Sequence, residues 1–171
     1  MKHSKRKGDN FERKIAKILS DRFASFLGNK RGFLRNLGSG ARFGGKNSIQ
    51  ASLITEEIKT VGDIVTPKSF RFNIECKHYA EAPSFKAILT QSVSLFDKWI
   101  EQAELDHKTM GTDYWCVIMK FNLVPESVIL PDTLISEFPD YIIKYKTNII
   151  IGLDYFLSKP DDFYFKGGTK Q

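Results

Sequence analysis

The sequence predicts an α/β fold in which a central mixed β-sheet is flanked by helices. Three observations lead to this prediction: two segments have helical periodicity, several apolar runs have the length of strands, and the two kinds of segment alternate along the chain. A length of 171 residues fits one domain. We expect that domain to carry a basic N-terminal segment, 1–8, and a C-terminal extension, 122–171.

The first helix is predicted over residues 9–27. Asp9 or Asn10 can cap its start, and Gly28 followed by Asn29 ends it. Apolar side chains recur along it at helical spacing: Phe11, Ile15, Ile18, Leu19, Phe23 and Phe26.

Strands follow this helix. A short strand is predicted over 31–37, whereas 47–60 has no clear pattern. Two further strands are predicted over 63–66 and 70–77, with a turn at 67–69 between them that would allow the two to pair as a hairpin.

The second half of the chain begins with a long helix, predicted over 84–107 because its apolar residues keep to one face. Apolar runs predict strands over 114–121 and 148–154. Residues 122–147 contain three of the six prolines and are expected to be irregular, with room for one short helix.

Composition excludes several classes of protein. Two cysteines, Cys76 and Cys116, are too few for a disulfide scaffold or a zinc module of the usual spacing, and both lie in apolar strands as expected for inert buried thiols. No run approaches the roughly 18 apolar residues of a membrane span. We therefore expect a cytoplasmic protein of a bacterial, archaeal or phage-infected cell, with no membrane partner.

The positive charge is concentrated at one end of the chain. Residues 1–46 hold thirteen Lys and Arg and three acids, a net of +10, whereas residues 47–171 hold thirteen bases and seventeen acids, a net of −4. A basic end of this kind suits a polyanion such as DNA, because each neutralised phosphate releases counterions. The alternative is a solvated tail that keeps the protein soluble.

The strand over 70–77 carries the strongest signal for chemistry. Its side chains alternate, so that Glu75 and Lys77 point to one face, roughly 7 Å apart along the strand. Asp63 opens the preceding strand and would lie near Glu75 if the two strands pair. Two carboxylates beside a lysine predict a Mg²⁺ site, although Glu and Lys also alternate on solvent faces of ordinary strands.

Glu12 is a third candidate carboxylate. It falls within the apolar arc of the first helix, where an unpaired charge is costly. It can therefore serve the site, form a structural pair with Arg22, which lies in the same arc, or lie where the helix frays.

Together these segments resemble the PD-(D/E)XK nuclease superfamily, and most of all its archaeal Holliday junction resolvases and related phage endonucleases. The resemblance rests on the helix-1 glutamate Glu12, the loop LGSGAR, and the motifs GDIV and IECK, within residues 7–121. It implies a restriction-endonuclease-like αβββαβ core. Gly62 stands where the superfamily usually has proline.

The resemblance also implies roles for individual residues. Asp63, Glu75 and the carbonyl of Cys76 would bind the metal, which is Mg²⁺ with Mn²⁺ as a substitute. Lys77 and Glu12 would act in catalysis beside them. The glycine-serine loop would contact DNA.

Six residues are predicted to bind DNA. Three are bases of the N-terminal segment, and three are donors of the glycine-rich loop, where glycine permits close approach to a phosphate. They are Lys5, Arg6, Lys7, Ser39, Arg42 and Lys46.

The predicted function is Mg²⁺-dependent hydrolysis of phosphodiester bonds, most readily in branched DNA. The alternatives are a restriction-type or nicking endonuclease on the same fold, and an accessory DNA-binding protein without catalysis. Paired cuts at a four-way junction would need a homodimer. Apolar residues in 141–145 and 149–165 could form its interface or could cap the sheet of their own chain.

Overall fold

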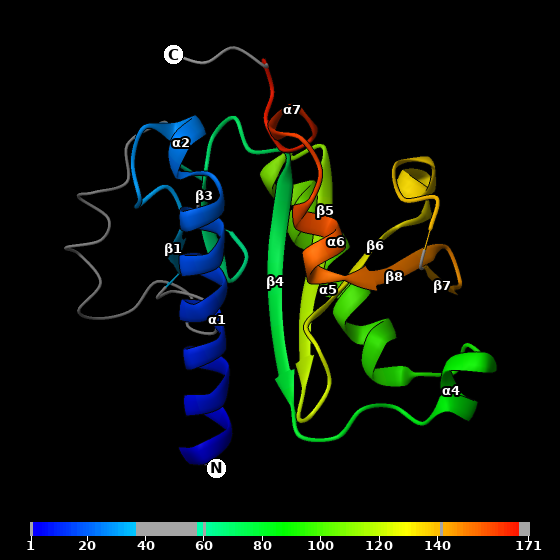
Figure 1. Ribbon diagram of the computed structural model, residues 1–171. Helices are drawn as coiled ribbons and strands as arrows, with labels where there is room; N and C mark the ends of the chain where they lie inside the picture. Colours follow the sequence, from blue (N-terminus) through cyan, green and yellow to red (C-terminus); the bar gives the residue numbers. More distant parts are fainter. Residues whose placement is uncertain (1, 37–57, 60, 141, 168–171) are drawn as a thin grey trace.

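A mixed sheet of five strands forms the centre of the protein (Figure 1). The computed structural model describes residues 2–36, 58–59, 61–140 and 142–167, and for 2–5 and 58–59 it describes the backbone alone. In the sheet β4 pairs with β5 in parallel, and the remaining pairs are antiparallel. The strand order is β4 (Phe72–Tyr79), β5 (Tyr114–Phe121), β6 (Ser127–Pro131), β8 (Asn148–Gly152) and β7 (Ile143–Tyr145).

A second, smaller sheet lies beside the free edge of β4. In it β3 (Ile64–Pro67) pairs with β1 (Leu34–Arg35) and β2 (Ile58–Lys59). The hairpin that 63–66 and 70–77 could have formed is absent from the described strand pairings, because β3 pairs with β1 and β2 while β4 pairs with β5. The turn between them is confirmed, since the Phe70 amide donates to the Pro67 carbonyl at 2.9 Å.

The N-terminal helix is longer than predicted. α1 spans Lys2–Arg22 and a short α2 spans Ala24–Leu27, so the basic segment is helical and Asp9 is an interior residue rather than a cap. Asp9 is paired with Arg35 of β1 instead. Gly28 ends the helical region as predicted, with a left-handed φ of 66°.

The long helix predicted over 84–107 is two helices. α4 spans Phe85–Leu89 and α5 spans Ser94–Met110. Gln91 between them has φ 50°, a left-handed conformation that no helix accommodates. Ser84 caps α4 by accepting from the Ala87 amide, as its position before the helix suggests.

The segment after β5 is more regular than predicted. It contains β6, the 3₁₀ helix η1 (Asp132–Glu137) and β7, followed by β8, α6 (Leu153–Leu157) and α7 (Asp161–Tyr164). The strand predicted over 148–154 thus ends at Gly152. Phe156, Tyr164 and Phe165 are buried against the α1 face of the sheet. They cap the sheet of their own chain, so they are not available as a dimer interface.

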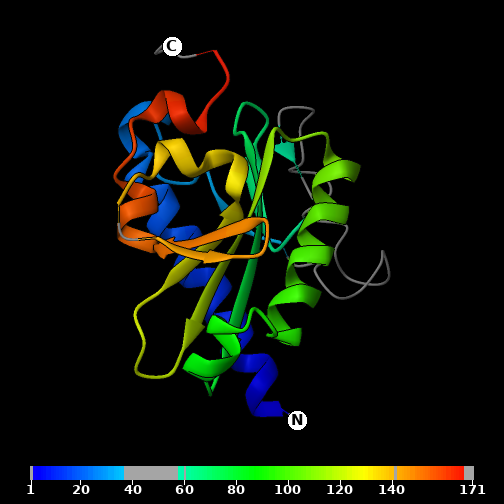
Figure 2. The ribbon, with the colours of Figure 1, turned by 90° about the vertical axis from the view of Figure 1, so that its right-hand side faces the viewer.

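Helices cover both faces of the sheet (Figure 2). On one face α1 and the C-terminal aromatics pack against alternate residues of β4 and β5, including Ile74 and Ile118. On the other face α5 packs against Trp115, Val117 and Met119. The predicted α/β fold with a mixed sheet flanked by helices is confirmed. None of the described helices is long and apolar enough to cross a membrane.

Candidate active site

The two faces of β4 differ in chemistry, as its alternation predicts. Phe72, Ile74 and Cys76 belong to the apolar core under α1. Glu75 and Lys77 point to the face that α5 covers, and Glu75 is only 1% exposed. A carboxylate so far from water is costly unless nearby groups compensate for it.

A tight turn brings Asp63 to this strand. Gly62 has φ 89°, and a Cβ there would lie 2.6 Å from Oδ1 of Asn73 and 2.9 Å from the carbonyl oxygen of Ile74. Only glycine fits such a position, because it has no Cβ and tolerates a positive φ. The turn is held by the Asp63 amide, which donates to the Ile74 carbonyl at 3.0 Å.

Asp63 also contacts β4 through its side chain. Its Oδ2 accepts from the backbone amide of Cys76 at 2.8 Å. In an extended strand the N–H and C=O of one residue point to the same side. The Cys76 carbonyl therefore lies on the same edge of β4 as Asp63.

Lys77 joins the two carboxylates. Its Nζ lies 2.7 Å from Oε2 of Glu75 and 3.9 Å from Oδ2 of Asp63. It also donates to Oε1 of Gln102 on α5 at 3.0 Å. The structure thus brings together Asp63, Glu75 and Lys77, although the hairpin from which their proximity was inferred does not form.

The carboxylates are not fully compensated by Lys77. Burial, followed by the charge of Asp63, raises the pKa of Glu75 to about 8 despite the contact with Lys77. Burial alone would lower the pKa of Lys77, but the charges of Glu75 and Asp63 outweigh it and raise that pKa. Lys77 is therefore a cation at neutral pH in the metal-free protein.

The donor set fits a hard divalent cation. Within the described part of the chain, no three acidic, histidine or cysteine side chains converge as metal ligands. Two carboxylates and the Cys76 carbonyl nevertheless suit Mg²⁺, which usually keeps waters and takes substrate phosphate oxygens as further ligands. A cation would also relieve the repulsion between Asp63 and Glu75.

Glu12 lies beside this site but has its own partner. Its carboxylate accepts from Nε of Arg35, whose Nη2 is paired with Asp9 at 2.6 Å. Burial raises the pKa of Glu12, and the charge of Asp63 contributes in the same direction. The alternative pairing with Arg22 is wrong, because Arg22 binds Asp161 at 2.8 Å.

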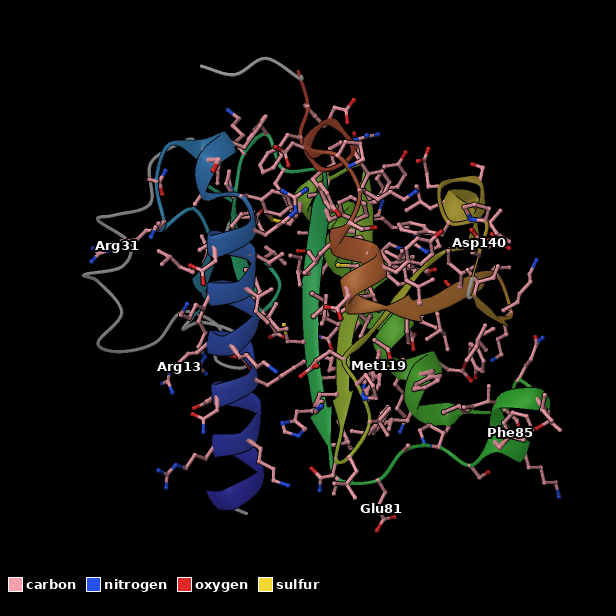
Figure 3. The ribbon with its side chains drawn as sticks, in the orientation of Figure 1. Arg13, Arg31, Glu81, Phe85, Met119 and Asp140 are labelled. Atoms are coloured by element: carbon pink, nitrogen blue, oxygen red, sulfur yellow. The ribbon has the colours of Figure 1, made fainter. Side chains whose placement is uncertain are left out.

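The predicted DNA-binding residues are placed only in part. Arg6 and Lys7 are exposed on α1. The side chain of Lys5 and all of Ser39, Arg42 and Lys46 lie outside the described residues. Arg13 and Arg31, which the sequence did not single out, are exposed and point away from the sheet (Figure 3).

Sequence reasoning missed three polar residues near the site. Gln102 and Arg35 come from elements distant in the chain, and no local pattern marks either one. Asn73 is 3% exposed, and in the described structure its Nδ2 has no hydrogen-bond partner. The two cysteine thiols are buried and their pKa values are raised by that burial, as expected for inert groups.

Comparison with known proteins gave two matches. The model of a family described as phage putative PDDEXK endonuclease matches residues 3–159. Among solved structures, Hjc, a Holliday junction resolvase from the archaeal hyperthermophile Archaeoglobus fulgidus, is similar with a TM-score of 0.37 and 15% sequence identity. That match covers 87% of this chain and 91% of the other. A search of curated proteins found no match.

Proposed function

This chain belongs to the phage PDDEXK endonuclease family, and from that premise we propose that it hydrolyses DNA phosphodiester bonds at Asp63, Glu75 and Lys77 with a divalent metal ion. The membership confirms the resemblance to PD-(D/E)XK nucleases and makes the chain a nuclease. Mg²⁺ is the proposed cofactor, with Mn²⁺ as its substitute.

One observation carries the proposal. Two buried carboxylates share a site with a single lysine, and the pKa of Glu75 is raised to about 8. A carboxyl group whose pKa is perturbed this strongly by burial and by a neighbouring carboxylate marks a candidate functional site. A divalent cation is the species that would compensate for the two carboxylates.

The residues of the site have different roles in the proposed hydrolysis. Asp63, Glu75 and the Cys76 carbonyl would hold the metal, which supplies polarisation of the scissile phosphate and a lowered pKa for attacking water. Lys77 is held as a cation beside the carboxylates and would offset negative charge that develops on the phosphate. As the water oxygen bonds to phosphorus, the water would lose a proton to solvent, the P–O3′ bond would break, and the 3′ oxygen would take up a proton from solvent. The products are 5′-phosphate and 3′-hydroxyl ends.

Glu12 is placed in this proposal as a supporting residue. Its pairing with Arg35 leaves it outside the Asp63–Glu75 pair, while its electrostatic coupling to Asp63 places it within reach of the same charge. Loss of Glu12 should therefore slow cleavage less than loss of Glu75.

We propose branched DNA as the preferred substrate and a homodimer as the active form. The support is that the described chain carries one set of Asp63, Glu75 and Lys77. Two symmetric cuts at a four-way junction would then take two chains related by a twofold axis. The proposed place of action is the cytoplasm of a phage-infected or other prokaryotic cell.

A cleavage assay tests this function. The protein is incubated with a four-way junction, linear duplex and single strands of matched sequence, each with Mg²⁺ and with EDTA. We expect Mg²⁺-dependent cleavage that is fastest on the junction. Defined cuts in linear duplex would instead favour a restriction-type enzyme, and DNA binding without any cleavage would favour an accessory protein.

A further inference from the structure

The ammonium group of Lys77 is held from two directions. Oε2 of Glu75 accepts from it at 2.7 Å along β4, and Oε1 of Gln102 accepts at 3.0 Å from α5. A lysine ammonium has three N–H donors. We propose that Gln102 is a positioning residue, whose carboxamide oxygen orients Lys77 toward the reacting phosphate; this inference rests on the proposed function.

Lys77 needs a second acceptor because Glu75 would also bind the proposed metal. The proposed metal uses the carboxylate of Glu75, which weakens that carboxylate as an acceptor for Lys77. A neutral amide oxygen on α5 makes no comparable claim on the metal and adds no further charge beside Asp63. It can therefore hold Lys77 through the whole reaction.

Gln102 is itself exposed, and the packing of α5 places its backbone beside the site. Trp99 and Ala103 on the same helix are 4% and 0% exposed and anchor it to the sheet. Asp106, one helical turn after Gln102, contributes to the raised pKa of Glu75, so this side of α5 faces the site. A glutamate at 102 would add a second helix carboxylate here, whereas glutamine supplies an acceptor without charge.

Two substitutions separate the acceptor from the shape of the side chain. Gln102→Met keeps the length and the helix propensity but removes the acceptor, while Gln102→Glu keeps an acceptor. Glu101→Ala, at an exposed neighbouring position, serves as the control. We expect Gln102→Met to lower kcat about tenfold, as befits one hydrogen bond to a charged group, with KM and the Mg²⁺ dependence changed less than about twofold. Gln102→Glu should keep more of the wild-type kcat than Gln102→Met, because it retains an acceptor, but less than the wild type, because it adds a charge beside the proposed metal ligands.

A second readout reports on Lys77 without requiring activity. Acetylation of Lys77, followed by mass spectrometry of the protein digest, should be several-fold faster in Gln102→Met than in the wild type or in Glu101→Ala. Wild-type kcat in Gln102→Met, or equal Lys77 labelling in the two proteins, would overturn the inference. Absence of cleavage by the wild type in Mg²⁺ would instead overturn the proposed function. The labelling would then test only the contact between Gln102 and Lys77.

Discussion

Two charged clusters of this protein have opposite compositions. Midway along β4, Glu75 shares one lysine, Lys77, with Asp63, and the pKa of Glu75 is raised to about 8. In the turn between β5 and β6, Glu126 lies 2.6 Å from Nζ of Lys14 and 3.4 Å from Nζ of Lys120.

The pKa of the glutamate is shifted in opposite directions in the two clusters. Although burial opposes it, hydrogen bonding from Lys14 and the two lysine charges lower the pKa of Glu126, so this cluster is satisfied by the protein itself. The cluster on β4 has more acid than base and little access to water. The comparison indicates that one cluster stabilises the fold, by tying α1 to the sheet, while the other is the cluster that the proposed cation would complete.

The largest expected effect is on the rate of DNA cleavage, which should depend on Asp63 and Glu75 and not on Glu126. Glu75→Gln or Asp63→Asn should lower cleavage in Mg²⁺ by roughly a thousandfold, since each removes a metal-binding charge worth several kcal/mol in the transition state. DNA binding measured in Ca²⁺ should stay within a few-fold of the wild type. Glu126→Gln is the matched control and should cleave normally, with a stability loss of at most about 1 kcal/mol. Normal cleavage by Glu75→Gln would place the active site elsewhere.

The next effect is the dependence of stability on pH. An unfolded glutamate titrates near 4.5, whereas folded Glu75 titrates near 8, so between these values the folded state holds a proton that the unfolded state does not. The free energy of unfolding of the metal-free protein should therefore fall as pH rises, by up to about 1.4 kcal/mol per unit between about pH 5 and 8. Urea denaturation across this range measures it.

Two variants sharpen this pH test. Glu75→Gln should flatten the profile and should be more stable than the wild type at pH 8, whereas Glu126→Gln should keep the wild-type slope. An equally steep fall in Glu75→Gln would show that another group is responsible.

A smaller effect concerns the turn that delivers Asp63. Gly62→Ala should lower stability by about 2 to 3 kcal/mol and should slow cleavage, because a Cβ at φ 89° would collide with Asn73 and with the Ile74 carbonyl. Gly111→Ala is the matched control, since Gly111 has φ 61° but no heavy atom within 4 Å of the added Cβ, and should cost only about 1 kcal/mol. Chemical denaturation compares the two. Equal costs would mean that the crowding at Gly62 is easily relieved.

The smallest effect lies outside both clusters. Replacing the exposed Arg6 and Lys7 by alanine should weaken binding to many DNA sequences alike and leave kcat unchanged. The slope of log K against log salt should become shallower by about 0.9 for each phosphate that the variant no longer neutralises. An unchanged slope in a filter-binding titration would show that these residues only aid solubility.

Sequence alone predicted the features that depend on local pattern. The strand over 114–121 is confirmed residue by residue, and the period-two alternation of β4 correctly assigned Glu75 and Lys77 to one face. The structure also brings Asp63 and Glu75 together around Lys77, as the sequence suggested.

The features that failed depend on partners elsewhere in the chain. β4 pairs with β5 rather than β3, and this pairing depends on contacts between residues distant in the sequence. The break at Gln91 uses a left-handed conformation that glutamine rarely adopts. β6 lies in a segment that was predicted to be irregular because it contains prolines. The contacts of Gln102 with Lys77 and of Arg35 with Glu12 join residues 25 and 23 positions apart, which no periodicity reveals.

The most direct test of the metal site is the number of protons released when Mn²⁺ or Mg²⁺ binds at pH 7. Because the pKa of Glu75 is raised to about 8, its carboxyl must lose its proton to ligate a cation. Calorimetric titrations in buffers of different ionisation enthalpy should show release of about one proton at pH 7 and almost none at pH 9, with Glu126→Gln unchanged. Tight metal binding by Glu75→Gln, or binding by the wild type at pH 7 without proton release, would contradict a metal site at Asp63 and Glu75.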